Sequence, residues 1–409
     1  MTVMVVVMDF PSLARLRARA TAKWAHYPAD VLPLWVAESD FPTCPAVCEA
    51  IREACSNEQF GYPAPTPEFG EALAGFAQRR YGVELTPEWI FPVADVVSGL
   101  VLALEAFTDP ARPVLIPNPC YPPFLALGEL SGRSLLKYHY RNDTTATPAE
   151  ATEISAFAHP DLAADIVLDL QEIEQLFAAG AGALVLCNPH NPLGVTHSSQ
   201  QLVKLAELAE RYDAKIISDE IHAPLVYGTT HVMAATVSET ARRRTITLTA
   251  ASKAFNVAGL KCAQFITTNA EDASRFAAIH PLKREGYSPL GLAAATSCYS
   301  RGDDFLDEEL AILEHHRHLV ASLVAEHLPG VRYRIPQATY LAWLDCRHLP
   351  LDQAPGEFFL QHAKVAVNEG ADFGPAGRGF VRLNFATSEE ILRQAFAQMG
   401  QALVEAGIR

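Results

Sequence analysis

The chain has 409 residues, of which 49% are hydrophobic and 19% are charged, and this composition excludes collagen-like, coiled-coil and intrinsically disordered proteins. Its 32 Lys and Arg residues are outnumbered by 47 Asp and Glu residues, which gives a net charge of −15 with no long basic stripe. Because nucleic-acid backbones attract clustered positive charge, we expect no nucleic-acid partner. A chain of this length is expected to form two or three domains.

The N-terminal stretch MTVMVVVMDF is apolar, but it is too short for a signal sequence and lacks a basic region before it. Elsewhere no apolar run approaches the ~18 residues that are needed to span a bilayer. The eight cysteines form no CxxC pair, so we expect reduced thiols and no metal site. These features predict a cytoplasmic protein without a membrane segment.

Helical spacing of apolar residues is the first pattern along the chain. It predicts a helix within residues 12–25, another over Pro45–Cys55 with proline in its first turn, and a third over PAPTPEFGEALAGFAQRRYG that stops at Gly82. From about residue 90, apolar runs alternate with helical segments. Buried strands are expected in PVLIPNPCY, GALVLCNPHNPLG, AKIISDEIH, TITLTAASKAF and CAQFITT. This alternation predicts an α/β fold with a mostly parallel sheet covered on both faces.

Past residue 285 the pattern changes. Helical patterns dominate over residues 303–327, and YLAWLDC, AKVAVNEG and GFVRLNFA indicate a small sheet with a closing helix. We therefore expect an N-terminal segment over residues 1–45 that packs with the small domain, a large domain over residues 46–287, and a small α+β domain over residues 288–409. Residues 141–164 are polar and weakly patterned, which is typical of a surface insertion.

Three motifs follow predicted strands, at the sheet edge where open α/β sheets bind ligands: NPHNPLG, SDEIH and SKAFN. They place Asn191, Asp219 and Lys253 at one crevice. A buried Asp needs a positive partner such as a pyridinium N–H, a Lys can form an imine with an aldehyde, and an Asn can donate to a phenolate oxygen. These three demands together describe pyridoxal 5′-phosphate (PLP).

Taken alone, each candidate side chain has an ordinary explanation. Lys253 could be a solvated lysine, Asp219 a helix cap and Arg382 a partner in a surface ion pair. Tyr121 could pack in a turn, and His222 could be a structural histidine. Their joint occurrence at strand ends, in this order along the chain, favours a functional site.

With these motifs the chain resembles the fold-type-I, PLP-dependent aminotransferase superfamily, and within it the MalY/PatB-type cystathionine β-lyase branch. The motifs that carry the resemblance are LPLWVAESDFP, FGYP, NPHNPLG, SDEIH, SKAFNVAGLK, TYLAWLDC and FVRLNFAT. The resemblance implies a large domain with a mostly parallel seven-stranded sheet plus a smaller α+β domain. It also implies PLP as the cofactor and a homodimer.

The resemblance also implies roles for individual residues. The catalytic set would be Lys253, which binds the cofactor covalently, Asp219, which pairs with the ring nitrogen, and Tyr121, which stacks on the ring. Phosphate and ring contacts are implied for Val96, Val97, Asn191, His222, Ser252, Lys261 and, from the partner subunit, Tyr62. Substrate contacts are implied for Arg382, which would clamp the α-carboxylate, and for Asn191, Trp35 and Ala37.

The chain departs from the family pattern at several positions. Relatives commonly read WVADMDF where this chain has Glu38 and Ser39, a change at the substrate entrance. Ala250 stands where a phosphate-site serine is common, and Lys261 stands where many relatives have Arg.

The resemblance implies a β-lyase that cleaves L-cystathionine or another cysteine S-conjugate to a thiol, pyruvate and ammonia. An aminotransferase of class I/II would use the same Lys253, Asp219 and Arg382, so the motifs do not separate the two reactions. A non-catalytic PLP-binding regulator is a remote alternative, because such proteins usually append a helix-turn-helix domain and we expect no such domain in this chain. The expected partner is a small amino-acid substrate.

Overall fold

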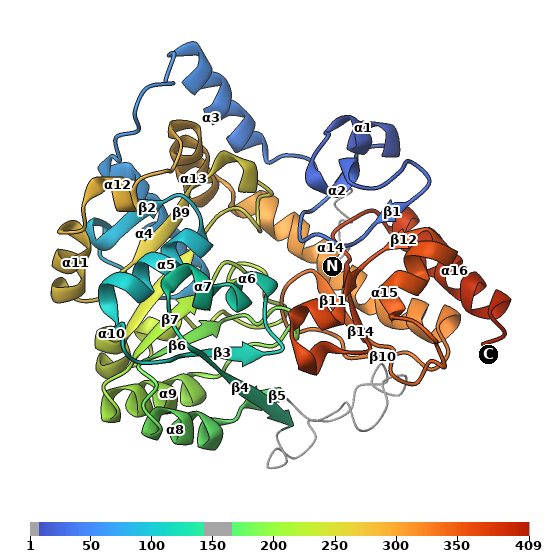
Figure 1. The fold of residues 1–409 in the computed structure, drawn as a ribbon. Coiled ribbons are helices and arrows are strands. Elements are labelled where there is room, and N and C mark those ends of the chain that lie inside the picture. The colour runs from blue at the N-terminus through green and yellow to red at the C-terminus, as the bar shows by residue number, and fades with distance from the viewer. Residues whose placement is uncertain (1–7, 143–165, 409) are drawn as a thin grey trace.

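The structure is a computed structural model that describes residues 8–142 and 166–408. Within these residues, the larger sheet has eight strands in the order β2-β9-β8-β7-β6-β3-β4-β5 (Figure 1). Their bounds are β2 (Ile90–Val93), β3 (Val114–Asn118), β4 (Leu135–Asn142), β5 (Ile166–Leu168), β6 (Ala183–Cys187), β7 (Lys215–Asp219), β8 (Thr245–Thr249) and β9 (Ala263–Ile266).

The prediction of a mostly parallel sheet is confirmed, since among its strands only β9 and β5 run in the direction opposite to the others. The number of strands is eight rather than the expected seven. The extra strand is β5, a three-residue edge strand that pairs with the end of β4. A run this short carries no periodicity that would reveal it in the sequence. The expected insertion over residues 141–164 lies almost entirely outside the described residues.

Both faces of this sheet are buried at its central strands β3, β6 and β8, which explains why β6 is a continuous apolar run rather than an alternating one. Val185 of β6 belongs to a core with α5 (Val96–Phe107) on one face. Leu184 and Leu186 belong to a second core with α8 (Leu170–Ala178) and α9 (Ser199–Arg211) on the other. Helix α9 begins at a capping box made by Ser198 and Gln201.

A second, antiparallel sheet has the order β10-β11-β14-β13. Its strands are β10 (Arg332–Tyr333), β11 (Leu341–Asp345), β13 (Asn368–Glu369) and β14 (Phe380–Asn384), and the helices α14 (Asp303–His327) and α16 (Glu389–Glu405) accompany it. Helix α13 (Pro289–Arg301), which precedes α14, packs instead on α3 (Pro45–Ser56) and α4 (Pro67–Tyr81). The domain boundaries at residues 45 and 287 stay a prediction.

The N-terminal segment forms two short helices, α1 (Leu13–Ala18) and α2 (Ala22–Ala25), rather than one. They are separated at Ala20, whose φ of 51° lies in the left-handed region and breaks a right-handed helix. The remaining helices are α6 (Pro122–Leu125), α7 (Leu127–Ser131), α10 (Glu239–Arg244), α11 (Ala270–Ala277), α12 (Pro281–Arg284) and α15 (Pro355–Phe358). Among the described helices, none has the length and apolar content that a membrane crossing requires.

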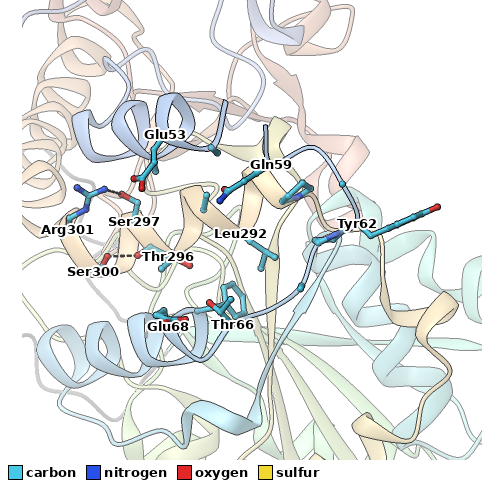
Figure 2. A pocket seen from close by; sticks show the side chains of 18 residues that line it. Glu53, Gln59, Tyr62, Thr66, Glu68, Leu292, Thr296, Ser297, Ser300 and Arg301 are labelled. Atoms are coloured by element: carbon cyan, nitrogen blue, oxygen red, sulfur yellow. Dashed lines mark hydrogen bonds between the residues drawn. The ribbon is translucent and has the colours of Figure 1, made fainter. Parts of the chain in front are cut away.

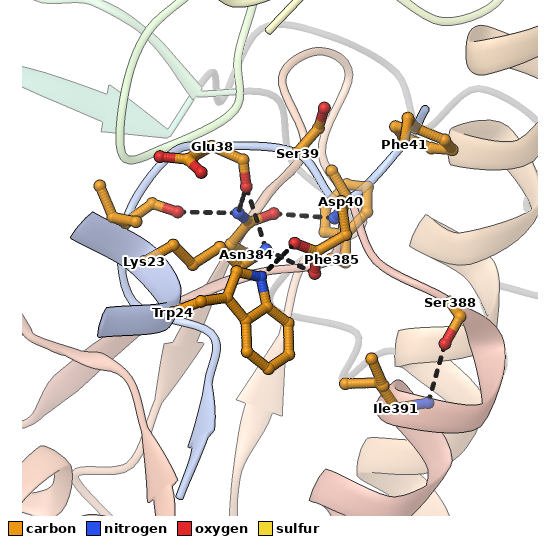
Figure 3. Close-up of polar contacts among 12 residues, drawn as sticks. Lys23, Trp24, Glu38, Ser39, Asp40, Phe41, Asn384, Phe385, Ser388 and Ile391 are labelled. Atoms are coloured by element: carbon orange, nitrogen blue, oxygen red, sulfur yellow. Dashed lines mark hydrogen bonds and ion pairs between the residues drawn. The ribbon is translucent and has the colours of Figure 1, made fainter. Parts of the chain in front are cut away.

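Residues 32–40 are held by hydrogen bonds to β12 and to β14 of the second sheet. Strand β1 (Leu32–Pro33) pairs with β12 (Val365–Ala366), part of the AKVAVNEG segment. The buried Asp40 carboxylate accepts from Lys23 Nζ at 2.8 Å and from Trp24 Nε1 at 2.7 Å, as Figure 3 shows. Asn384 of β14 donates to the carbonyl oxygens of Val36 at 2.8 Å and Glu38 at 2.7 Å. Because the buried ion pair is also hydrogen-bonded by Trp24 and by the Glu38 carbonyl, removal of one partner would leave an uncompensated buried charge.

Candidate active site

A cavity of about 410 Å³ lies at the carboxyl ends of the parallel strands, where the three sequence motifs end. Residues at the ends of four strands, at the start of α5 and in loops line its wall. They include Tyr121 after β3, Cys187 of β6, Asp219 of β7, Ser252 and Lys253 after β8, Val96 and Val97 of α5, and Ala37, Asn191, His222 and Lys261. The structure therefore brings together most of the residues that the sequence singled out, from segments more than two hundred residues apart.

Asp219 is buried at the end of β7, and its carboxylate accepts a hydrogen bond from the Ile221 amide at 3.1 Å. Burial raises the pKa of this carboxyl to about 7, because no ion pair within the described residues compensates its charge. An acid in this position needs a cationic donor from a bound molecule to stay ionised.

Lys253 follows β8, and its Nζ atom donates to the carbonyl oxygen of Ala37 at 2.8 Å. Burial is the main cause that lowers the pKa of its ammonium, to about 8, and the positive charge of Arg382 adds to the effect. A lysine with this pKa has a substantial neutral fraction near pH 8, which is what a nucleophile or a general base requires.

Arg382 comes from β14 of the second sheet. Its guanidinium donates to Asn191 Oδ1 at 3.0 Å, to Asn368 Oδ1 at 2.6 Å and to the Trp35 carbonyl at 3.1 Å. Its Nε atom is buried and has no partner among the described residues. A carboxylate could accept from that unused N–H, and the guanidinium is held in place to offer it.

The amino end of α5 faces the same cavity. Asp95 caps the helix by accepting from the Ser98 amide at 2.8 Å, and Lys261 pairs with the same carboxylate at 2.9 Å. The hydrogen bonds of the described chain leave the amides of Val96 and Val97 without a protein acceptor, and such amides at a helix start bind phosphate readily.

The comparisons with known proteins agree with this geometry. The model of the family "Aminotransferase class I and II" matches residues 29–398. The chain belongs to this aminotransferase family. A cystathionine β-lyase of Corynebacterium glutamicum is 45% identical over 97% of this chain and 100% of its own length. The PatB cystathionine β-lyase of Bacillus subtilis is 33% identical over 91% of this chain and 93% of its own length.

Solved structures of the aminotransferase family superpose over nearly the whole chain. A Corynebacterium diphtheriae protein, provisionally assigned as a PLP-dependent β-cystathionase, has a TM-score of 0.89 and 44% identity and covers 97% of this chain and 99% of its own. Cystalysin of Treponema denticola, whose structure contains PLP, has a TM-score of 0.87 and 26% identity and covers 98% of this chain and 100% of its own. The expected fold type is therefore confirmed.

Three predicted residues are not part of the cavity wall: Arg382, which is connected to it through its hydrogen bond to Asn191, and Tyr62 and Trp35. The Tyr62 side chain is fully exposed and points away from the protein, at the rim of a separate cavity of about 740 Å³ between α3, α4 and α13 (Figure 2). The Trp35 ring packs against His26 and Tyr27, and only its carbonyl oxygen reaches Arg382. A role of Tyr62 in its own chain's cavity is thus not supported by its position.

Three residues near the candidate site were not predicted from the sequence: Tyr340, Asn368 and Asp95. The Tyr340 hydroxyl donates to the Ala37 carbonyl at 3.1 Å, the same oxygen that accepts from Lys253. Asn368 accepts a hydrogen bond from Arg382, and Asp95 accepts one from Lys261. Tyr340 lies in TYLAWLDC, a motif that carries the resemblance, but only the packing of the N-terminal segment beside β11 reveals its contact with Ala37.

Proposed function

We propose that this protein is a PLP-dependent carbon–sulfur β-lyase that acts on L-cystathionine or a related cysteine S-conjugate. The observation that carries the proposal is the 45% identity to the Corynebacterium glutamicum cystathionine β-lyase over 97% of this chain. It is supported by the cavity at the strand ends, whose side chains are those that such a reaction needs.

The cavity fits PLP on its own chemistry. The buried Asp219 lacks a cationic partner among the described residues, and the protonated pyridine nitrogen of PLP would supply one. The amides of Val96 and Val97 would hold the phosphate, together with Ser252 and Lys261, which line the same end of the cavity. Lys253 would bind the cofactor aldehyde, Tyr121 would cover the ring, and Asn191 and His222 would flank it.

When bound, PLP supplies a ring that withdraws electrons from the substrate Cα. The chain's own residues would do the rest. Arg382 would orient the α-carboxylate through its unused Nε donor, with Asn191 fixing the guanidinium. Lys253, released as a neutral amine, would remove the Cα proton as the general base. Asp219 would keep the ring nitrogen protonated. The Cβ–S bond would then break, the sulfur would leave as a thiol, and addition of water would yield pyruvate and ammonia.

The decisive experiment is a pyruvate assay. The protein purified with PLP is given L-cystathionine without any 2-oxo acid, and pyruvate and thiol are measured together. A lyase forms both in equal amounts over many turnovers. An aminotransferase forms neither product. When a 2-oxo acid is added, it transfers the substrate's amino group to that acid and leaves the carbon–sulfur bond intact. This second outcome would replace the proposal by the aminotransferase alternative.

We also propose a homodimer in the cytoplasm. The support for the dimer is the position of Tyr62, whose ring is exposed on an outward-pointing loop rather than turned into its own chain's cavity (Figure 2). Tyr62 would reach the phosphate of the partner's site from there. Light scattering at micromolar concentration tests the assembly directly.

A further inference from the structure

Glu38 is an acidic residue that the proposed mechanism does not use. It directly follows Ala37, whose carbonyl oxygen accepts hydrogen bonds from Lys253 Nζ and the Tyr340 hydroxyl. The backbone of Glu38 is held on both sides, because its amide donates to the Val36 carbonyl at 2.9 Å and its carbonyl oxygen accepts from Lys23 Nζ at 3.0 Å and from Asn384 Nδ2 at 2.7 Å. Its side chain is therefore aimed by a rigid segment rather than by a loose loop.

The Glu38 carboxylate points away from the buried Lys23–Asp40 pair, as Figure 3 shows. Its side-chain hydrogen bond comes from the Thr21 hydroxyl. The ion pairs of the described residues do not include Glu38, whereas Asp40, two positions further, is fully paired with Lys23. Glu38 is also half-buried rather than buried, so a molecule that enters from solvent could reach its carboxylate.

The charge of Glu38 acts on the candidate site. Burial is the main cause that lowers the pKa of the Lys253 ammonium, and the nearby negative charge of Glu38 opposes this lowering. Burial likewise raises the pKa of the Tyr340 hydroxyl, and Glu38 raises it further. The geometry agrees with this influence, because Glu38 adjoins Ala37, which lines the cavity and whose carbonyl oxygen accepts from both Lys253 and Tyr340.

We infer that Glu38 binds the cationic end of the substituent on the substrate's sulfur, and so selects thioethers that carry an ammonium group beyond the sulfur. This inference rests on the proposed lyase function and names its substrate class. L-Cystathionine belongs to that class, because its homocysteine half carries a second ammonium group. Arg382 would hold the carboxylate of the cysteine half, which leaves the distal half to be recognised by other groups near the entrance.

The arrangement provides what such recognition needs. The Glu38 carboxylate is positioned in advance by its backbone contacts and by Thr21, so little ordering is needed when a cation binds. A hydrogen bond between an ammonium and a half-buried carboxylate is stronger than one between neutral groups, and loss of the substrate's ammonium would leave the carboxylate without its partner.

The test compares two substrates that differ only in the distal amino group. L-Cystathionine and S-(3-carboxypropyl)-L-cysteine have the same thioether, the same chain length and the same distal carboxylate. We measure kcat/KM for pyruvate release from both, with wild type and with Glu38→Gln. The inference predicts that the wild-type preference for cystathionine falls ~10-fold in Glu38→Gln, mainly through KM for cystathionine. An effect on Lys253 itself would lower both values and cancel in this ratio.

Two further variants complete the experiment. Glu38→Asp keeps the charge and is expected to retain more of the preference than Glu38→Gln. Thr21→Val removes the hydroxyl that orients Glu38 and is expected to lower the preference by a smaller factor. An unchanged ratio in Glu38→Gln overturns the inference and leaves the lyase function intact. Failure of the wild type to release pyruvate from either thioether refutes the lyase function instead.

Discussion

The Nζ atom of Lys253 and the hydroxyl of Tyr340 share one acceptor, the carbonyl oxygen of Ala37, at 2.8 Å and 3.1 Å. Lys253 follows a strand of the large sheet, Tyr340 precedes a strand of the second sheet, and Ala37 belongs to the N-terminal segment. The three parts of the chain therefore meet at the candidate catalytic lysine. The position of Lys253 depends on all of them.

Lys253→Ala should bind PLP only non-covalently and lose turnover by orders of magnitude, because the attachment point and the base are the same side chain. Borohydride treatment followed by mass spectrometry should fix the cofactor to the wild-type chain and not to the variant. Near-normal pyruvate formation by Lys253→Ala would rule out the assigned role.

The pH dependence of kcat should follow the neutral fraction of Lys253. Burial lowers the pKa of this ammonium to about 8, and the base must be neutral to accept a proton. The rate should therefore rise as the pH increases through about 8 and level off above it. Initial rates between pH 6 and 10 check this. A rate that is flat across the whole range would show that another group removes the proton.

The apoenzyme should be destabilised by its own Asp219 as the pH rises. Burial raises the pKa of this carboxyl from 3.8 to about 7 in the folded chain, so the protonated form favours folding below pH ~4 and that stability is lost as the pH rises through about 7. Asp219→Asn should thus stabilise the apoenzyme at pH 8 by up to about 4 kcal/mol relative to wild type, with a smaller gain at pH 5.

Denaturant unfolding of the apoenzyme at the two pH values measures this difference. In the presence of PLP the same substitution should lower the activity severely, because the ring nitrogen loses its acidic partner. An equal effect of Asp219→Asn on stability at pH 5 and pH 8 would contradict the assignment of a buried, unpaired carboxylate.

Arg382→Lys should raise KM for amino-acid substrates, because a point charge replaces a planar guanidinium that contacts Asn191, Asn368 and the Trp35 carbonyl. The expected increase is ~10-fold or more, with a smaller effect on kcat. Steady-state kinetics with cystathionine measure it. If the substitution lowers the melting temperature and leaves KM unchanged, Arg382 is a structural residue and not a substrate ligand.

Tyr62 should act in the partner's site. Tyr62→Ala, assayed at limiting PLP, and Lys253→Ala are each inactive or impaired alone. In a mixed dimer with shared sites, one site carries both defects and the other carries none, so mixing should restore activity above either parent. No gain on mixing, or a monomer in light scattering, would reject the shared site. Tyr62→Phe, which loses only the hydroxyl, should raise the PLP dissociation constant modestly.

The sequence was sufficient to predict what lies at the strand ends of the large sheet. Asn191, Asp219 and Lys253 reach one cavity because parallel strands place their carboxyl ends at one edge, and this follows from the pattern alone. It was not sufficient for contacts across sheets. Asn368 bonds to Arg382 through the pairing of β13 with β14, a register that no local pattern reveals.

Two other differences have local causes. The helix expected within residues 12–25 is broken at Ala20, which adopts a left-handed backbone conformation. Alanine does not favour that conformation, so the break could not be predicted from the residue type. Lys261 was expected at the phosphate, and it lies at the correct end of the cavity, but in the structure it pairs with Asp95. Because that acid also caps α5, the pairing depends on the three-dimensional position of the helix start and not on spacing along the chain.

The fastening of residues 32–40 to the second sheet has a consequence for how the protein is made. Asn384, which bonds to the carbonyl oxygen of Val36, is synthesised 348 residues after it. Synthesis at ~5–20 residues per second separates the two by roughly 20–70 s. Until β14 has been made, Asn384 cannot bond to residues 36 and 38. The wall that holds Lys253 is therefore completed only after the strands of the large sheet have been synthesised, and a nascent chain has the large sheet before it has the complete candidate site.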